Sequence, residues 1–598
     1  MAQKKSPSFI ERLPIGVAGR LILIGFLIGT VSGLGAAGFF ISLEWVSHFA
    51  FDTLAHAPMS APAGEEIFHA SHAGEEPIRW IFFILPIIGG LISGFLVYQF
   101  APEAEGHGTD AMIDAFHNKA GFIRTRVPFI KSVATIATLG LGGSAGREGP
   151  IAQIGAGFGS WIATKLGLSA RERRIMLLAG CAGGLGSIFR SPLGGALTSI
   201  EVLYSEDFET EALIPSIISS VTGYAIFTSI FGNRPIFDIP YFTWSPVELI
   251  FYTILGLICV PVGIFYIKVF YGMRDYVFRK IKLPRFLLPA LGGLGVALLG
   301  LLIPEVYGGG WGIMQDALHG DVALKLMLYI VLAKILATSF TIGSGGSGGV
   351  FGPTLFIGGM LGGVVGLAAH QLFPGSIYNP GAFVLVGMAS FFAGVANAPI
   401  GALIMVSEMT GGYKLLAPLM IVSALAILFS RRYSIYEKQV KDKFASPAHI
   451  GDLTINVLEE MKVEDCYHHD KKLTILPNNM TFGQFRKLIT STDLNQFPIA
   501  DSEGRLEGVV AIKATRQGIF NHSLDDLVLL SDVATRLYTV KLEDDLYTAL
   551  ILFLKTNYTT LYVTDPEDEN RLIGVIHHDD LIQKYYEEVA RRKDDQDD

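Results

Sequence analysis

The first 450 residues contain a succession of apolar stretches, most of them close to the length that crosses a lipid bilayer. A spanning helix needs about 20 mostly apolar residues. Glycine and proline interrupt many of the stretches, a pattern typical of channels and transporters, in which irregular backbone at membrane depth lines a cavity. We therefore expect a polytopic α-helical membrane domain. The stretches are 17–43, 78–100, 213–231, 246–272, 286–303, 323–342, 354–373, 381–396 and 414–430.

Charged residues are distributed unevenly along the chain. Residues 451–598 hold 28 acidic and 16 basic side chains, whereas residues 1–450 hold 27 and 30. Overall the chain is 50% hydrophobic, with a net charge of −9 and 3 cysteines at no recurring spacing. These values exclude a disordered protein and a disulfide scaffold and argue against a nucleic-acid partner. We predict a cytoplasmic segment over 1–16, a membrane domain over 17–445, a soluble α+β region over 446–590, and an acidic tail over 591–598 that is disordered.

Basic residues predict the orientation of the chain in the membrane. Arg171, Arg173 and Arg174 are expected in one cytoplasmic loop, and a second basic cluster spans 274–285. The stretch 52–77 holds glutamates and histidines but no Lys or Arg, and it is expected to be external. The first apolar segment is too long for a signal peptide. We expect a multi-pass protein of the plasma (inner) membrane with both termini in the cytoplasm, in contact with lipid.

A 25-residue segment occurs twice in the membrane domain. Residues 131–155 and 334–358 align without a gap and share 13 identical residues. The domain is therefore predicted to consist of two homologous halves, about 78–231 and 286–431, with the substrate site at their interface. Two shorter matches pair Pro192, Gly194 and Glu201 with Pro399, Gly401 and Glu408, and the segment Gly106-His107-Gly108 with Gly310-Trp311-Gly312.

Each repeated segment contains a glycine-rich loop that ends in Gly-Pro and precedes an apolar helical run. Proline suits the first turn of a helix, and glycine leaves the backbone N–H groups uncovered. A helix N-terminus carries about half a positive charge and free N–H donors. Two such ends at a repeat interface would bind an anion weakly enough to release it, which conduction requires. Glu148 in the first loop is an intramembrane carboxylate that could occupy this anion site itself and leave it on protonation.

Other interpretations of the loops are weaker. Gly343, Gly345 and Gly348 have the spacing of a dinucleotide fingerprint, but no βαβ unit surrounds them. Ser144 and Ser347 have the spacing of a nucleophile elbow, which leaves a membrane serine hydrolase as a remote alternative. Close helix packing through small residues accounts for part of the glycine content but not for Glu148.

The sequences Gly146-Arg147-Glu148-Gly149-Pro150 and Gly349-Val350-Phe351-Gly352-Pro353 resemble the GREGP and GxFxP motifs of the CLC chloride channel and transporter family. The resemblance implies a non-enzymatic homodimer of two inverted repeats that carries chloride or a similar small anion, with no required cofactor and no metal site. It implies that Glu148 is the gating glutamate and that Tyr436 closes the inner anion site. The implied anion ligands are His107, Gly108, Gly146, Arg147, Gly149, Gly349, Val350, Phe351, Gly352 and Tyr436.

Two positions depart from the family pattern. Family members carry serine, or proline in nitrate users, where this chain has His107, so an imidazole replaces a hydroxyl and could make occupancy of the inner site depend on pH. Proton-coupled members often have paired glutamates where this chain has Glu201 followed by Val202, and valine cannot relay protons. We therefore favour passive, glutamate-gated chloride conduction. Chloride/proton exchange with a non-standard internal proton path is the alternative.

The soluble region also repeats. The segments 497–510 and 561–576 each combine two short β runs around a turn, with helices expected near 481–491 and 543–555. This resembles a pair of CBS domains, about 446–520 and 528–590, which would stabilise a dimer or bind an adenine nucleotide. The resemblance implies Asp580 as the ribose ligand, although His577 replaces the usual Ser or Thr. The histidines near 468, 577 and 56–72 lack the spacing of a tetrahedral metal site.

Overall fold

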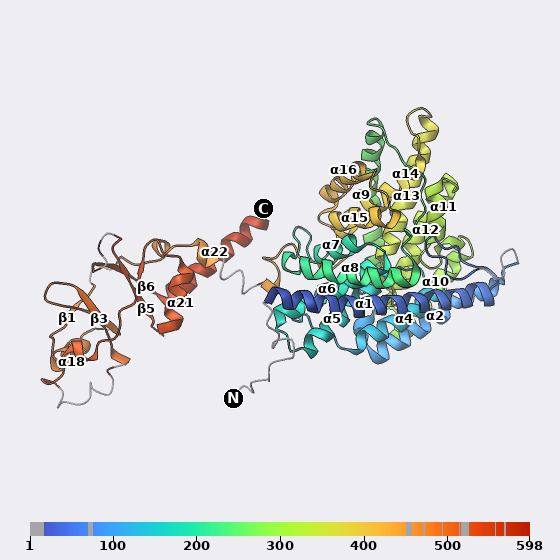
Figure 1. Ribbon diagram of the computed structural model, residues 1–598. Helices are drawn as coiled ribbons and strands as arrows, with labels where there is room; N and C mark the ends of the chain where they lie inside the picture. Colours follow the sequence, from blue (N-terminus) through green and yellow to red (C-terminus); the bar gives the residue numbers. More distant parts are fainter. Residues whose placement is uncertain are drawn as a thin grey trace. The chain divides into compact units, whose positions relative to one another are not determined.

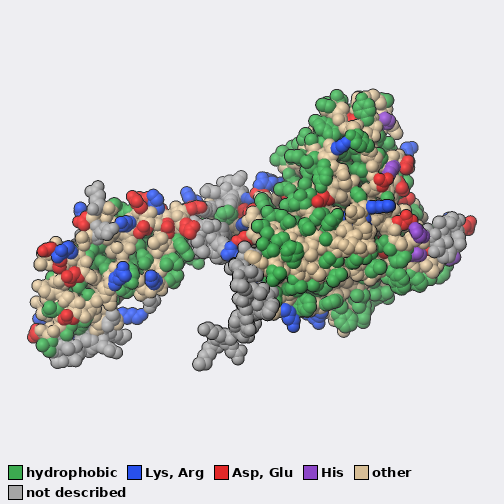
Figure 2. Space-filling model, in the orientation of Figure 1, with side chains coloured by type: hydrophobic (Ala, Val, Ile, Leu, Met, Phe, Trp, Pro, Cys, Tyr) green, Lys and Arg blue, Asp and Glu red, His purple; other side chains and the backbone are tan. Residues whose placement is uncertain are grey.

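The computed structural model describes residues 17–69, 76–449, 457–469, 473–492, 494–513, 515, 525–556, 558–566, 568 and 570–597. The described chain forms two compact units, a membrane unit that ends at Ala448 and a C-terminal unit that begins at His449 (Figure 1). Apolar side chains cover most of the visible face of the membrane unit, whereas charged side chains are frequent on the C-terminal unit (Figure 2). The expected polytopic helical fold with an α+β region is confirmed.

The membrane unit consists of helices in two sets that follow one another in the same order. Six of the described helical stretches are long and apolar enough to cross a membrane, and several others are shorter. The first set is α1 (Val17–Ser47), α2 (Arg79–Phe100), α3 (Thr109–Asn118), α4 (Arg126–Gly140), α5 (Glu148–Lys165), α6 (Ala170–Ile188), α7 (Pro192–Glu201) and α8 (Leu213–Phe231). The second is α9 (Glu248–Gly272), α10 (Leu288–Gly300), α11 (Trp311–His319), α12 (Leu324–Gly343), α13 (Phe351–Leu372), α14 (Pro380–Ala396), α15 (Pro399–Thr410) and α16 (Leu416–Ser430).

Helix α6 was not predicted, and it contains the arginines that we expected in a loop. Ser169 precedes the helix, and its hydroxyl accepts a hydrogen bond from the N–H of Glu172, whose carboxylate in turn accepts one from the N–H of Ser169. This capping box starts the helix ahead of the arginines. Arg171, Arg173 and Arg174 therefore lie in its first turns. Four charged residues in these turns lowered the apolar character on which the prediction relied.

Glycine allows helices α5 and α6, and their counterparts α13 and α14, to pack backbone to backbone. A Cβ atom on Gly155 would lie 2.2 Å from the carbonyl oxygen of Gly180, and one on Gly358 would lie 2.4 Å from that of Gly387. Gly358 is the repeat counterpart of Gly155. Small residues at such crossings are how membrane helices approach closely. The two helix pairs form the scaffold behind the glycine-rich loops.

The C-terminal unit contains two sheets of the same topology. In each sheet the first two strands are parallel and the last two antiparallel, with orders β1-β2-β3 and β4-β5-β6. Val509 of the first sheet packs with Tyr562, Leu572 and Val575 of the second. The strands are β1 (Leu476–Pro477), β2 (Gln496–Ala500), β3 (Leu506–Ala511), β4 (Thr539–Lys541), β5 (Thr560–Thr564) and β6 (Leu572–His577). The helices are α18 (Phe482–Ile489), α20 (Leu530–Val533), α21 (Leu546–Thr556) and α22 (His578–Asp597).

Helix α22 continues through Asp597, so the acidic tail that we expected to be disordered is helical over its described residues. The last turns contain neither glycine nor proline. Arg591 donates to Glu588 at 2.7 Å, three residues earlier, which is a spacing that stabilises helices. The aspartates extend a helix that residues 578–590 have already formed.

The packing of α5 on α6 leads to a stability prediction. Gly155→Ala should lower the free energy of unfolding by about 1–3 kcal/mol, because the added methyl group meets the backbone of α6. Gly38→Ala in α1 is the matched control, since a Cβ there meets no atom within 4 Å. The melting temperature of detergent-purified protein would be measured. Equal melting temperatures for the two variants would contradict the prediction.

Candidate anion-binding site

The two glycine-rich loops are joined by reciprocal backbone hydrogen bonds. The N–H of Gly146 donates to the carbonyl of Gly349 at 2.7 Å, and the N–H of Gly349 donates to that of Gly146 at 2.6 Å. Gly146 and Gly349 are repeat counterparts. Side chains of the flanking helices follow the same rule, since Thr135 bonds Ser347 and its counterpart Thr338 bonds Ser144. Each contact has its symmetry mate, as expected for inverted halves related by an approximate two-fold axis between the loops.

These contacts correct two of the predicted sites. The N–H groups of Gly146 and Gly349 were expected to bind the anion, but each is donated to the opposite loop. The N–H groups of Arg147 and Val350, which follow these glycines, take no part in the two bonds. The hydroxyls of Ser144 and Ser347 bond threonines across the interface, and among the described residues neither serine is hydrogen-bonded to the base that a nucleophile requires.

Helices α5 and α13 begin directly after the loops, at Glu148 and Phe351, and both N-terminal turns are buried. Pro150 and Pro353 occupy the first turns, where a missing N–H costs no helical bond. The loop at His107 approaches α5 so closely that a Cβ on Gly149 would lie 2.2 Å from the carbonyl oxygen of His107. Gly149 therefore admits the 106–108 loop to the start of the helix.

The side chain of Glu148 lies at the beginning of the opposite half's helix. It is fully buried, and its Oε2 accepts a hydrogen bond from the N–H of Gly352 at 3.0 Å. Its Oε1 has no hydrogen-bond partner within the described part of the chain. The counterpart Phe351 instead packs on Phe392, with ring centroids 4.0 Å apart. Only one half thus contributes a carboxylate, and this carboxylate occupies a helix N-terminus suited to an anion.

His107 and Tyr436 lie together. Both are largely buried, and their ring centroids are 5.6 Å apart. His107 Nε2 is 3.1 Å from Oδ2 of Asp110, while Nδ1 is buried and has no hydrogen-bond partner among the described residues. The imidazole therefore has one ring nitrogen anchored and one available to a ligand.

Two buried lysines hold the loops that precede α3 and α11. Lys131 Nζ donates to the carbonyls of Ala104 (3.0 Å) and Gly106 (2.7 Å). Lys334 Nζ donates to those of Val306 (3.1 Å) and Gly308 (2.7 Å). Lys131 and Lys334 are identical at matching positions of the repeat, which is a signal in the sequence for a shared structural role.

The lysine contacts correct the third repeat match. They pair Gly106 with Gly308, so the residue that corresponds to His107 is Gly309 and not Trp311. The starts of α3 at Thr109 and α11 at Trp311 have the same offset. The short Gly-x-Gly pattern recurs at 308–310 and 310–312, and sequence alone favoured the wrong one.

Glu201 and Glu408 cap each other's helices. The carboxylate of Glu201 accepts from the N–H groups of Ile400 (3.0 Å) and Gly401 (2.7 Å) at the start of α15. Glu408 accepts from Gly194 at 2.9 Å at the start of α7. Val202 is 2% exposed, and its carbonyl accepts from the side chain of Gln439 at 3.2 Å. Glu201 therefore has a structural role at this interface, and position 202 offers only backbone polarity.

In the C-terminal unit the predicted ribose ligand Asp580 is already engaged. Its Oδ2 is 2.8 Å from Nε2 of His468. His577 contacts the hydroxyl of Thr560 at 3.0 Å, and His469 contacts the carbonyl of Ile573 at 2.7 Å. His72, one of the histidines considered for a metal, lies outside the described residues. Nucleotide binding stays a prediction.

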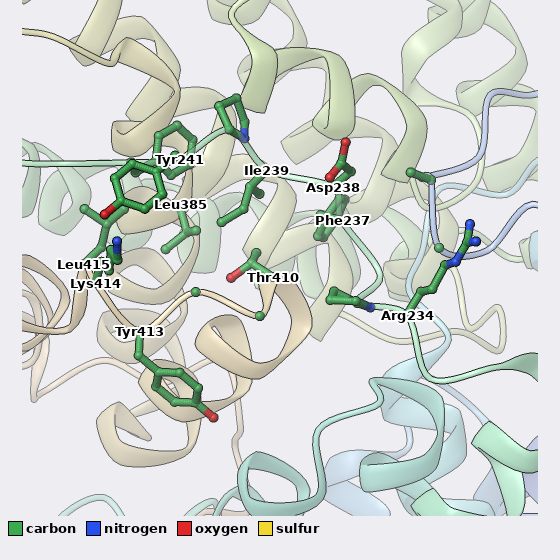
Figure 3. A pocket seen from close by; sticks show the side chains of 17 residues that line it. Arg234, Phe237, Asp238, Ile239, Tyr241, Leu385, Thr410, Tyr413, Lys414 and Leu415 are labelled. Carbon is green, nitrogen blue, oxygen red and sulfur yellow. The ribbon is translucent and has the colours of Figure 1, made fainter.

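A cavity of about 860 Å³ lies apart from Glu148, between the segment 234–242 and the turn 410–415. Tyr241 and Lys414 lie next to each other in its wall, with Nζ of the lysine 3.3 Å from the ring centroid (Figure 3). None of the residues that flank Glu148 lines it. The cavity is therefore not part of the candidate anion site.

Inverted helical halves that bring buried helix N-termini and one carboxylate together define a membrane anion-transport protein. The family described as voltage gated chloride channel matches residues 89–431, and the chain belongs to this family. The CBS domain family matches residues 530–587. CLC-type anion transport is therefore the activity of the membrane unit, and the chain is not an enzyme.

The names of known relatives refer to both modes of chloride transport. The H(+)/Cl(-) exchange transporter ClcA of Salmonella paratyphi B is 31% identical over 419 residues, which are 69% of this chain and 85% of that protein. The putative chloride channel protein ClcB-like of Ralstonia nicotianae is 31% identical over 57% of this chain and 80% of that protein.

Solved structures share the fold. A slow cyanobacterial Cl-/H+ antiporter superposes with a TM-score of 0.61 at 23% identity, over 69% of this chain and 94% of that chain. A eukaryotic CLC transporter covers 94% of this chain and 98% of its own, with a TM-score of 0.58 at 21% identity.

The reciprocal caps predict matched losses of stability. Glu201→Ala and Glu408→Ala should each lower the free energy of unfolding by about 1–2 kcal/mol, because each leaves the N–H groups of one helix start without an acceptor. The corresponding Gln variants keep a side-chain acceptor, and their free energy of unfolding should fall by less. Melting temperatures in detergent would be compared for all four. A Glu201→Ala protein as stable as the wild type would refute the capping role.

Proposed function

We propose that the membrane unit exchanges chloride for protons, with Glu148 as the group that both ions share. The observation that carries the proposal is the bond from the N–H of Gly352 to the Glu148 carboxylate across the repeat interface. An ionised carboxylate there competes with a chloride ion for the same donor. A protonated carboxylate has lost the charge that favours this position, so binding of a proton and binding of chloride are linked.

Sequence reasoning favoured passive conduction because Val202 cannot relay protons. The relatives support exchange better, since the ClcA protein named above as an exchanger aligns over more of the chain than the ClcB-like protein does. With Val202 buried, a proton would have to reach Glu148 from the inner side without a titratable side chain at position 202. The proposal therefore includes a non-standard internal proton path.

The proposal extends to assembly and orientation. Family membership supports a homodimer in which each subunit has its own anion path. The basic clusters of the sequence support cytoplasmic termini in the plasma (inner) membrane, with the stretch 52–77 on the external side.

A flux measurement tests the exchange. Purified protein in liposomes would be given a chloride gradient with the electrical potential clamped, and proton movement would be followed with a pH-sensitive dye. We expect chloride to drive protons uphill. Glu148→Gln should abolish proton movement while chloride flux continues, because the amide cannot carry a proton. Rapid chloride flux without proton movement in the wild type would establish passive conduction instead.

His107 predicts pH-dependent chloride binding on the inner side. An imidazole can gain a proton at acid pH, as the serine of family members cannot, and Nδ1 of His107, which has no hydrogen-bond partner among the described residues, would then donate to an anion. His107→Ser and His107→Asn should both reduce the change in half-saturating internal chloride between pH 5.5 and pH 7.5. Initial flux rates would be measured at a range of internal chloride concentrations. An unchanged pH dependence in both variants would show that His107 is not the titrating group.

A further inference from the structure

The segment 57–69, which we call the strap, is fixed across one side of the candidate site. The N–H of Gly64 donates to the carbonyl of Ile236 at 3.0 Å, and the N–H of Ala63 reaches Oε1 of Gln315 at 3.4 Å. Ser60 packs where a side chain on Gly312 would be, since a Cβ there would lie 2.1 Å from the serine hydroxyl. The strap thus rests on α11 and on the segment that follows α8.

The strap delivers Glu65 to Arg147. The two side chains form an ion pair in which each is only 4% exposed. The guanidinium also lies over the ring of Phe40, at 5.0 Å from its centroid, and 4.0 Å from a carboxylate oxygen of Glu44. Arg147 immediately precedes Glu148, so the partner of Glu65 is a full positive charge at the entrance to the anion site.

A cavity of about 430 Å³ lies between the strap and the rest of the unit. Arg147 lines it together with the acidic side chains of Glu44, Asp52, Glu65 and Glu66. An anion that approaches Glu148 from this side meets Arg147 first. An unpaired guanidinium here would bind chloride tightly, or would bind the Glu148 carboxylate, and tight binding slows release. An ion pair with a carboxylate offsets the charge of the guanidinium, so that the guanidinium binds a passing anion less tightly.

We propose that Glu65 is a positioning residue: it holds the Arg147 guanidinium in a close ion pair, with Glu44 as a more distant second carboxylate, and thereby keeps anion binding at the strap side weak. This rests on the anion transport of the unit and on the proposal that the strap side is external. Glu65 acts on the anion through Arg147. It is distinguished from Glu66, which lines the same cavity but whose side chain is 63% exposed and lies near His69 instead.

The test is sided chloride affinity. Half-saturating chloride and maximal rate would be measured separately from each side of oriented liposomes for wild type, Glu65→Gln, Glu65→Asp and Glu66→Gln. In Glu65→Gln, half-saturating chloride on the strap side should fall about tenfold, as should the maximal rate, because the guanidinium loses its close carboxylate, keeps only Glu44 at 4.0 Å, and gains chloride as a partner. The opposite side should keep its affinity, Glu65→Asp should restore both values at least in part, and Glu66→Gln should match the wild type.

Three results would overturn the proposal. Wild-type values in Glu65→Gln would show that the pair does not control affinity. Equal effects in Glu66→Gln would show that the total negative charge of the cavity, and not the Glu65–Arg147 pair, determines chloride affinity. Equal effects in Gln315→Ala, which loosens the strap but keeps the charge of Glu65, would show that the position of the strap controls chloride affinity. If Glu65→Gln does not fold, the double variant Glu65→Gln with Arg147→Gln removes both charges, and it must retain weak strap-side binding. A wild type without chloride flux would refute the transport proposal, whatever the variants do.

Discussion

The structure of the anion site depends on two hydrogen bonds that the glycine-rich loops exchange at Gly146 and Gly349. A loop at membrane depth must find partners for its backbone, because lipid offers none. Each loop here satisfies the other at Gly146 and Gly349 through the backbone alone, and the N–H groups of Ser144 and Ser347 donate to hydroxyls of neighbouring helices. The helices that follow are thereby brought N-terminus to N-terminus, with their partial positive charges directed at one small volume. Everything the site can do with an anion follows from this arrangement.

Symmetry constructs the site, and departures from symmetry give it a function. The threonine–serine contacts, the lysine clamps and the glutamate caps all occur twice. Glu148 does not, since its counterpart is Phe351, and Arg147 is likewise matched by Val350. One half therefore supplies a charge pair and the other an apolar wall. A pathway that binds an anion reversibly needs both, because a second carboxylate would repel the ion and a second guanidinium would retain it.

Sequence alone predicted the membrane fold, the repeated halves and the CBS region, because these depend on apolar length and on long identical segments. It failed where the physical cause is a contact between distant residues. Nothing near Glu65 indicates that it pairs with Arg147, and nothing near Glu201 indicates that its carboxylate caps α15. The repeat alignment of the segment around His107 was wrong for another reason, because a three-residue glycine pattern is too short to align uniquely. The lysine contacts and the starts of α3 and α11 distinguish the two choices.

The reciprocal caps of Glu201 and Glu408 bear on the origin of the chain. Each half caps the start of a helix in the other half. A half by itself would therefore expose N–H groups that its own sequence cannot satisfy. An ancestor that contained only one half of the membrane unit would have needed a second copy inserted in the opposite orientation in the same membrane. Both copies would have had the same sequence. Duplication and fusion would then have freed one copy to keep its glutamate at position 148 and the other to replace it with phenylalanine.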